Sequence, residues 1–511
     1  MDTLICAGGT GVRVLEAVLH LCAAGLGPPR LRTFVIDPDA TNGDGTDTRV
    51  LVKRYQELQQ TFGGGPFGFF NTTLELLRSE GDEQGLQVWS PVKRYQKFRS
   101  VLNYEALSPE QRDIVHLLYT PGELDMEMGL GYQGHPALGA AALALLPLFQ
   151  HDVPLLATFS GALKNDVASG FSRIAIAGSV FGGTGASTIH PLVRYLRSDG
   201  LLENNSERLK IAAIALAPYF QFSSANDTAT DEKIKREAAR SEDFPLASRS
   251  AAEYYDHLLS TDDWDFDAMY WVGDDSPQRV KYAPGGEYQK NPGHFVELLA
   301  ALACLDFFSN QPDGRACWYS GPEVPENCKQ NILSADDLPF RAPKDRARVM
   351  QRLELFQTIV IAHLGFYGPL LRDERLPKKS YCVPWYADRF SGTGDSLTTG
   401  QNAVSLQSLE DYWRDNYLPW WQEVHDANGR VRLLNTAAWQ GGSVELNRLG
   451  NVLFPDAPKH DLEVVDQLFS NMVKVANTAP DSPNAASRYL TMLAQASIQT
   501  IALRSANPTQ S

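Results

Sequence analysis

The sequence predicts an α/β protein: a mostly parallel sheet flanked by helices, with a central helix leading to a second, divergent domain that is α+β or mainly helical. Two observations predict this fold. Short apolar runs typical of strands alternate with helical patterns through the first half of the chain, and two of these runs pass through glycines directly into a helix. With 511 residues, 43% of them hydrophobic, the chain can bury a large core and form two to four domains.

Five apolar runs are predicted as strands of the sheet, namely Leu4–Ala7, Thr33–Ile36, Arg173–Ala177, Lys210–Ala217 and Ala268–Val272. An insertion at about residues 46–127 separates the second run from the third, and we expect helices in it at about Thr48–Thr61 and Ser108–Leu118. Ser108, followed by proline and then by Gln111, has the pattern of a capping box. Gly63–Pro66 follows no strand, so it is interpreted as a loop and not as a phosphate site.

An apolar segment from about Asn291 to Asn310 is predicted as a buried central helix, which ends a first domain at 1–310. Polar, Pro/Gly-rich sequence at 311–339 indicates a linker or insertion before a divergent C-terminal domain at 340–511. In that domain we expect helices at about Lys344–Leu364, Ser408–His425 and Ala485–Arg504.

Composition excludes several classes of protein. The 46 basic and 61 acidic residues give a net charge of −15, which disfavours binding to nucleic acid or anionic lipid. Six cysteines show no metal-ligand spacing and are too few for a disulfide scaffold, so reduced thiols and a cytoplasmic location are expected. The N-terminus has no basic, apolar leader, and the apolar runs fall short of the roughly 20 residues of a membrane span, so no export or membrane insertion is expected.

The two glycine-rich turns are candidate phosphate sites. A glycine lets backbone amides approach a phosphate closely, and the helix that follows adds partial positive charge at its N-terminus. The first turn alone is equally typical of tight packing, whereas two turns in one sheet can converge on one polyphosphate. The candidate residues are Gly8, Gly9, Thr10 and Gly11 in the first turn, and Gly182, Gly183, Thr184, Gly185 and Ala186 in the second.

Asp37 and Asp39 follow the second strand, where a carboxylate can meet a ribose hydroxyl or a metal-bound water. An exposed acid in a turn explains these residues equally well.

The second glycine turn resembles the phosphate-facing loop of the tubulin/FtsZ superfamily, in which a run of glycines precedes Thr-Gly-Thr/Ser-Gly. Phe181 and Ser187 replace glycines at its two ends. Other segments resemble the family's nucleotide loops in the same order. They are Gly8–Gly11, Val35–Ala40, Met128–Gly139 with Gly131 and Gly134 near the γ-phosphate, and Ile214–Phe220 with Pro218 on the ribose side. The resemblance covers roughly the first 310 residues and does not extend into the C-terminal half.

The resemblance implies that the ligand is GTP or GDP with Mg²⁺. Guanine would be recognised by Asp274, after the fifth strand, and by Asn291 or His294 at the start of the central helix. A helix-capping asparagine is the alternative for Asn291. Family members hydrolyse GTP between subunits, with acids after the central helix of the neighbouring subunit. The nearest such acids are Asp336 and Asp337, which an insertion displaces; the alternative, that they solvate a loop ahead of Pro339, is favoured.

Three functions remain open at this stage. The resemblance implies a GTP-binding protein that assembles with itself head to tail and acts as a GTPase at the subunit junction. The acidic motif of the family is missing after Asp306, which favours a non-hydrolysing nucleotide-binding scaffold that binds another protein through its C-terminal half. A Rossmann-type dinucleotide enzyme using Gly9–Gly11 and Asp37 is the third, although it lacks the third fingerprint glycine and leaves the second turn unexplained.

Overall fold

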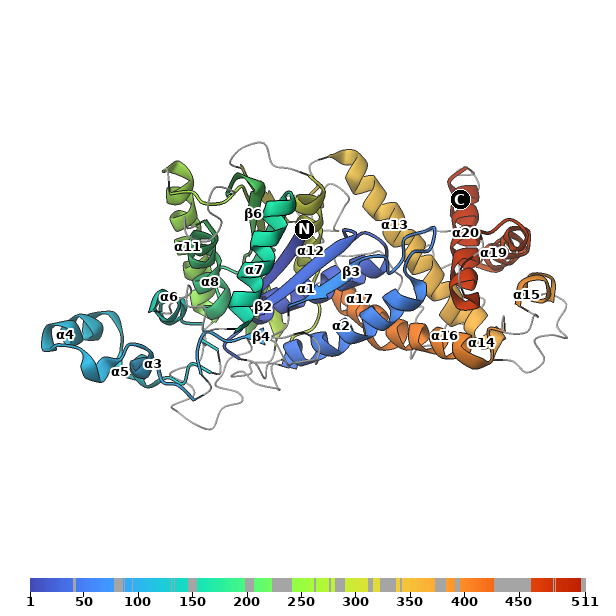
Figure 1. Cartoon of the computed structure of the whole chain (residues 1–511). Coiled ribbons are helices and arrows are strands. Elements are labelled where there is room, and N and C mark those ends of the chain that lie inside the picture. The colour runs from blue at the N-terminus through green and yellow to red at the C-terminus, as the bar shows by residue number, and fades with distance from the viewer. Residues whose placement is uncertain are drawn as a thin grey trace.

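The computed structural model describes residues 1–39, 43–77, 86, 88–93, 95–129, 131–132, 134–145, 154–197, 206–222, 241–261, 263–274, 277–280, 290–310, 316–321, 337–340, 342–372, 383–390, 396–426, 461–480, 482 and 484–506. Described residues of the first half form a parallel sheet with helices on both faces, and a mainly helical C-terminal region packs beside it (Figure 1). The predicted fold class is confirmed at this level.

The sheet of described residues has eight strands, all paired in parallel. They are β1 (Asp2–Ala7), β2 (Arg30–Ile36), β3 (Thr73–Leu76), β4 (Val88–Trp89), β5 (Ser172–Ser179), β6 (Leu209–Leu216), β8 (Ala268–Val272) and β10 (Ala316–Ser320). Their order is β10-β8-β6-β5-β1-β2-β3, with β4 also paired to β2. The strands β2, β3 and β4 therefore lie on one side of β1, and β5, β6, β8 and β10 lie on the other side. The direction in which strands are added to the sheet reverses between β1 and β5.

All five strands predicted from the sequence are present as β1, β2, β5, β6 and β8. The sequence did not predict β3, β4 or β10. β3 and β4 lie in the segment interpreted as an insertion, and β10 lies in the segment interpreted as a linker, where it pairs with β8. These edge strands are short, so their apolar pattern is weak. A separate pair, β7 (Phe220–Phe222) and β9 (Gln278–Val280), lies outside the main sheet.

Alternate residues of the sheet face two separate cores, as the two-residue period of a strand requires. Leu4 and Cys6 pack with the helices of one face, and Ile5 packs with those of the other. The first face carries α1 (Gly8–Ala23), α2 (Gly43–Phe62) and α12 (Phe295–Ser309); the second carries α7 (Pro154–Ser169), α8 (Gly183–Arg197) and α11 (Phe244–Ser260).

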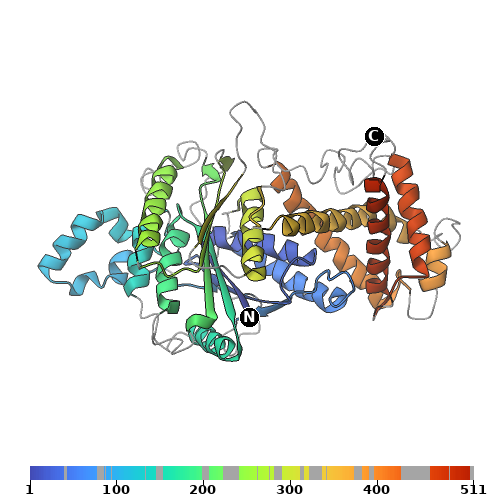
Figure 2. The same ribbon diagram turned by 90° about the horizontal axis from the view of Figure 1, so that it is seen from above.

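The predicted central helix is confirmed as α12, in which every residue from Phe295 to Phe308 is buried. It stands between the sheet and the C-terminal helices (Figure 2). Its almost uniformly apolar sequence is that of a helix covered on all sides.

Part of the 46–127 segment projects from the body as an arm (Figure 1 and Figure 2). The arm contains α3 (Phe98–Val101), a 3₁₀ turn (Tyr104–Ala106), α4 (Pro109–Leu118) and α5 (Pro121–Asp125), and α6 (Pro136–Leu145) follows it. The predicted capping box is present, because the Ser108 Oγ accepts from the Gln111 amide and the Gln111 side chain accepts from the Ser108 amide. Gly63–Pro66 is a loop, as predicted.

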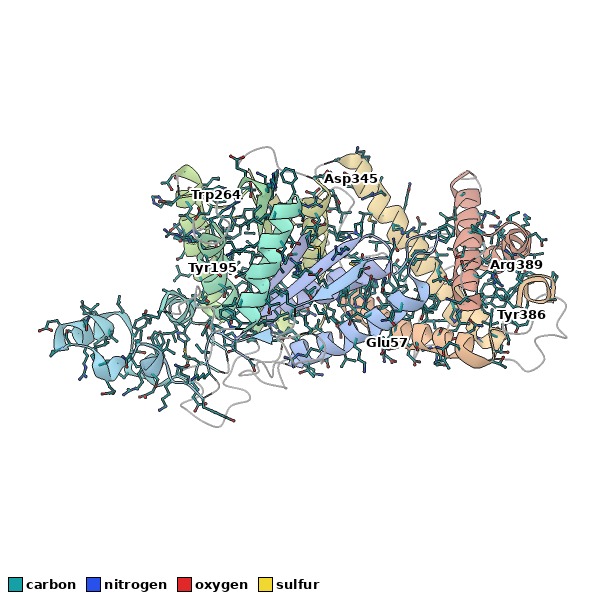
Figure 3. All side chains as sticks on the ribbon, viewed as in Figure 1. Glu57, Tyr195, Trp264, Asp345, Tyr386 and Arg389 are labelled. Atoms are coloured by element: carbon teal, nitrogen blue, oxygen red, sulfur yellow. The ribbon has the colours of Figure 1, made fainter. Side chains whose placement is uncertain are left out.

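The described residues after 342 form no strand. Their α-helices are α13 (Pro343–Ala362), α14 (Gly368–Leu371), α15 (Val383–Phe390), α16 (Gly400–Tyr412), α17 (Leu418–Asp426), α19 (Asp461–Ala476) and α20 (Ala485–Ala506). The π-helical turns His363–Tyr367 and Trp413–Tyr417 interrupt this pattern, and the second divides the predicted Ser408–His425 helix. Tyr386 and Arg389 of α15 lie at the far end of this region (Figure 3). No helix formed by the described residues combines the length and the apolar character needed to cross a membrane.

Candidate functional site

Three glycine-rich loops meet at the carboxyl edge of the sheet. Gly8 is the first residue of α1 and directly follows β1, and Gly183 is the first residue of α8, separated from the end of β5 by three residues. A Cβ atom added to Gly8 would lie 2.9 Å from the Cβ of Thr184. A Cβ added to Gly183 would lie 2.7 Å from the Cβ of Tyr132 and 3.2 Å from the amide nitrogen of Gly134. Segments far apart in the sequence are thus in contact.

Some of the predicted glycines serve packing. A Cβ on Gly11 would lie 2.6 Å from the Ala177 carbonyl oxygen, and a Cβ on Gly185 would lie 2.5 Å from the Ser179 carbonyl oxygen. These two residues let α1 and α8 approach the sheet closely. Four other residues of the two turns are partly exposed and can be reached by a ligand, namely Gly9, Thr10, Gly182 and Ala186. Gly131 has φ +84° and open space around its missing Cβ.

The helix starts at this edge suit an anion. No side chain caps α1 at Ala7, and the first turns of α1 and α8 contain no acidic residue. First-turn amides have no intrahelical acceptor, and the helix dipole places partial positive charge there. Both helices are at least 15 residues long, and a phosphate would satisfy these amides in both at once.

Buried carboxylates lie beside the glycine loops on the β2 side. Asp37 and Asp39 follow β2, and Asp44 lies in the first turn of α2. The Asp39 amide donates to Asp37 Oδ1 at 3.0 Å. Burial raises the pKa of Asp37 to about 7, and the Asp39 and Asp44 carboxylates add to the shift although the Asp39 amide opposes it. Asp37 in turn raises the pKa of the Tyr132 phenol further, beyond the effect of burial.

No group of three or more His, Cys, Asp or Glu side chains in the described part of the chain could hold a metal ion by itself. Mg²⁺ usually keeps several waters and shares its remaining positions between one or two carboxylates and substrate phosphates. Asp37 and Asp39 fit that arrangement next to the glycine loops.

Arg13 links the first glycine turn to the start of α12. Its Nε donates to Glu297 Oε1 at 2.5 Å, and one of its terminal nitrogens donates to Glu297 Oε2 at 2.9 Å. It also bonds the carbonyls of Asn291 and Pro292 and lies 3.5 Å from Asp44. All three charged side chains are at least nine-tenths buried.

Sequence reasoning missed Arg13, Asp44 and Glu297. A signal was present, because Arg13 and Glu297 are charged residues within two mostly apolar helices, and such residues need partners when buried. Glu297 also accepts from the Tyr219 hydroxyl at 2.7 Å, which ties the segment after β6 to the same network.

The two residues proposed for base recognition, Asn291 and His294, have different positions at the start of α12. His294, 1% exposed, is the N-cap residue, and its Nδ1 accepts from the Val296 amide at 3.2 Å in a capping box with Glu297. This placement favours a capping role for His294. Asn291 is half-buried and is not the cap; its amide donates to Asp44 Oδ1 at 3.2 Å. Its side-chain amide makes no hydrogen bond among the described residues.

Three further predicted residues, Pro218, Asp274 and Asp337, lie at the carboxyl edge of the sheet. Pro218 is half-buried after β6, and Asp274 is buried after β8. The Asp337 carbonyl accepts from the Ser320 hydroxyl at 2.8 Å, and Ser320 ends β10 opposite Val272 of β8. Asp337 therefore shares the edge that holds the glycine loops. An acid that completes the site of a neighbour in a head-to-tail polymer must instead lie at the opposite edge. Asp336 lies outside the described residues.

No protein-family model matches the sequence. A search among curated proteins finds no significant match. The function is therefore inferred from the fold and the site alone.

Proposed function

We propose that the chain binds a nucleoside polyphosphate, GTP or GDP, together with Mg²⁺ at the carboxyl edge of its sheet. One observation carries the proposal: the turns Gly8–Gly11 and Gly182–Ala186 touch each other between β1 and β5, where the strand order reverses. In open α/β sheets, ligands bind in the crevice outside the carboxyl ends of the strands at such a reversal.

The phosphates would bind to the first-turn amides of α1 and α8, with Thr10 and Thr184 near them and the Gly131–Gly134 loop on a third side. Asp37 and Asp39 would hold the waters of Mg²⁺. The ion supplies positive charge between these carboxylates and the phosphates, which would otherwise repel each other.

Guanine would be recognised from the α12 side. The Asn291 side chain offers an acceptor and a donor, and Asp274 offers a carboxylate; these groups complement the donors and acceptor on the guanine edge. Arg13 would act as a positioning residue, because it holds the carbonyls of Asn291 and Pro292 in place.

Introducing a negative charge at the helix starts tests phosphate binding without damaging the fold. Thr10→Glu and Ala186→Glu place a carboxylate in the first turn of α1 and α8, which is favourable for a helix but repels a phosphate. We expect GTP affinity, measured by calorimetry, to fall tenfold or more, because like charges about 4 Å apart repel by about 1–4 kcal/mol. Thr10→Gln and Ala186→Gln are the neutral controls. Unchanged affinity in both glutamate variants would remove the glycine turns from the site.

Competition among nucleotides tests the ligand class. GTP should bind more tightly than ATP, and Asn291→Ala should reduce that preference. The second candidate function is dinucleotide binding, which the strand order and the position of Asp37 after β2 also favour. Tighter binding of NAD or NADP than of GTP would establish that alternative.

Assembly and hydrolysis are a separate step of the proposal. The order of the loops resembles that of self-assembling GTPases, whereas the position of Asp337 favours a nucleotide-binding scaffold with another protein as partner. Pelleting with GTP, together with GTPase turnover that rises faster than linearly with protein concentration, would establish a head-to-tail polymer. Turnover strictly proportional to concentration, or unchanged in Asp336→Ala with Asp337→Ala, would leave the scaffold as the better account.

A further inference from the structure

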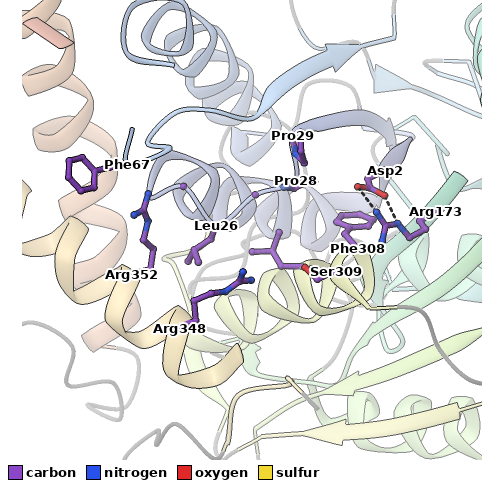
Figure 4. A pocket seen from close by; sticks show the side chains of 13 residues that line it. Asp2, Leu26, Pro28, Pro29, Phe67, Arg173, Phe308, Ser309, Arg348 and Arg352 are labelled. Atoms are coloured by element: carbon purple, nitrogen blue, oxygen red, sulfur yellow. Dashed lines mark hydrogen bonds and ion pairs between the residues drawn. The ribbon is translucent and has the colours of Figure 1, made fainter. Parts of the chain in front are cut away.

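A cavity of about 460 Å³ lies at the edge of the sheet opposite the glycine loops (Figure 4). Asp2 at the start of β1, the 25–29 loop after α1, the end of α12 and two arginines of α13 line it. Since β1 spans about 20 Å between Asp2 and the first glycine turn, this cavity is separate from the proposed nucleotide site. Its volume lies in the range of small-molecule sites, about 300–1,000 Å³.

The cavity is positively charged although the chain carries a net charge of −15. Three arginines and one aspartate line it. Arg173 is neutralised by Asp2, whose carboxylate accepts from the Arg173 Nε at 2.6 Å. Arg348 and Arg352 lie one turn apart on α13 and face the cavity together (Figure 4). Neither has a carboxylate partner among the described residues.

Arg352 is the stronger indication of an anion-binding site. It is half-buried, its Nε donates to the Ala24 carbonyl at 2.6 Å, and its guanidinium lies 4.4 Å from the centre of the Phe69 ring. Burial lowers the pKa of Arg352 to about 10, so the group remains charged at neutral pH. A partly desolvated charge without a counter-charge is unfavourable, and a bound anion would offset that loss.

The rest of the lining is apolar and includes Leu26, Pro28, Pro29, Phe67 and Phe308. We propose that this cavity binds a small amphiphilic organic anion, with a carboxylate or phosphate head between Arg348 and Arg352 and an apolar body against Leu26 and Phe308. The ligand would join the sheet to α13, the first helix of the C-terminal region, and would stabilise that contact. Nothing in this proposal depends on the nucleotide site.

Calorimetry on the full-length protein tests the proposal with four probes. Octanoate and octyl phosphate carry both parts of the ligand; octanol has only the body and inorganic phosphate only the head. We expect saturable binding of octanoate, octyl phosphate or both, at least tenfold tighter than that of octanol or phosphate. The comparison of the first two identifies the preferred head. Octanol binding as tightly as both anions would overturn the proposal.

Variants locate the binding. Arg348→Gln should weaken binding of the better anion about tenfold, because a charge-assisted hydrogen bond is lost. Arg348 is exposed, so the variant should fold normally. Arg352→Gln should weaken binding further, and its thermal unfolding shows whether the fold is intact. Lys344→Gln, in the exposed first turn of α13, is the matched control. Unchanged affinity in Arg348→Gln and folded Arg352→Gln, or displacement of the anion by GTP, would overturn the assignment.

Discussion

Gly8 of α1 and Thr184 of α8 touch across the β1–β5 pair, so closely that a Cβ atom on Gly8 would lie 2.9 Å from that of Thr184. Gly8 also has φ +72°, a backbone conformation that L side chains rarely adopt. The contact places two helix N-termini side by side at the reversal of the sheet.

Gly8→Ala should therefore strain the backbone at residue 8 and bring the new Cβ atom too close to Thr184. Together these effects should destabilise the protein by about 2–4 kcal/mol. Gly131→Ala is the matched control, because Gly131 also has positive φ but open space around its Cβ position. The control should lose only about 1–2 kcal/mol. Urea unfolding monitored by tryptophan fluorescence measures both, and equal losses would contradict a close Gly8–Thr184 contact.

Arg13→Met should cost about 3–5 kcal/mol of unfolding free energy, because Glu297 would remain charged in a fully buried position. Adding Glu297→Gln should recover a large part of that loss. Arg249→Met, which removes an exposed pair with Glu253, should change stability by less than about 1 kcal/mol. A double variant as unstable as the sum of its single variants would show that Arg13 and Glu297 are not coupled.

The pKa of Asp37, raised to about 7, predicts a dependence of stability on pH. The folded-state pKa of Asp37 lies above its value in the unfolded chain. The contribution of this carboxyl to the free energy of unfolding is therefore complete below about pH 4 and is lost as pH rises through 7. Asn resembles the protonated acid, so Asp37→Asn should gain stability relative to the wild type between pH 5 and pH 8. Asp47→Asn, at an exposed pair with Lys290, is the control. Parallel pH profiles of Asp37→Asn and the wild type would contradict the raised pKa.

The lowered pKa of Glu410, in the C-terminal region, predicts the opposite dependence of stability on pH. Burial would raise its pKa, but hydrogen bonds and ion pairs with His363 and Arg372 lower it to about 2. Its contribution to stability is present above about pH 4.5 and is lost as pH falls toward 2.

Glu410→Gln should therefore cost about 3 kcal/mol at pH 7 and progressively less as pH falls from 4.5 to 2. Thermal or urea unfolding across this range measures the difference. Asp415→Asn, at an exposed pair with Arg54, is the control and should cost less than about 1 kcal/mol at pH 7. A loss in Glu410→Gln that stays constant down to pH 2 would show that this carboxyl does not titrate with a lowered pKa.

Elements with strong local patterns could be predicted from the sequence. Five buried strands and the apolar central helix were predicted because their apolar residues follow one another at short, regular spacings. The capping box was predicted because Ser108 and Gln111 stand three residues apart at the start of a helix. The same holds for the glycine turns, since a strand that runs through glycines into a helix is a local signal. Their role in binding a ligand stays a prediction.

Which of these residues come into contact depends on the tertiary fold. Edge strands such as β10 form because a neighbouring strand supplies their hydrogen bonds, and their own sequence shows little of this. Only the fold brings Arg13 to Glu297, 284 residues away, or places Asp337 at the same edge as the glycine turns. The cavity beside Asp2 was equally hidden, because only the fold brings Arg348 and Arg352 of α13 together with the start of β1 and the end of α12.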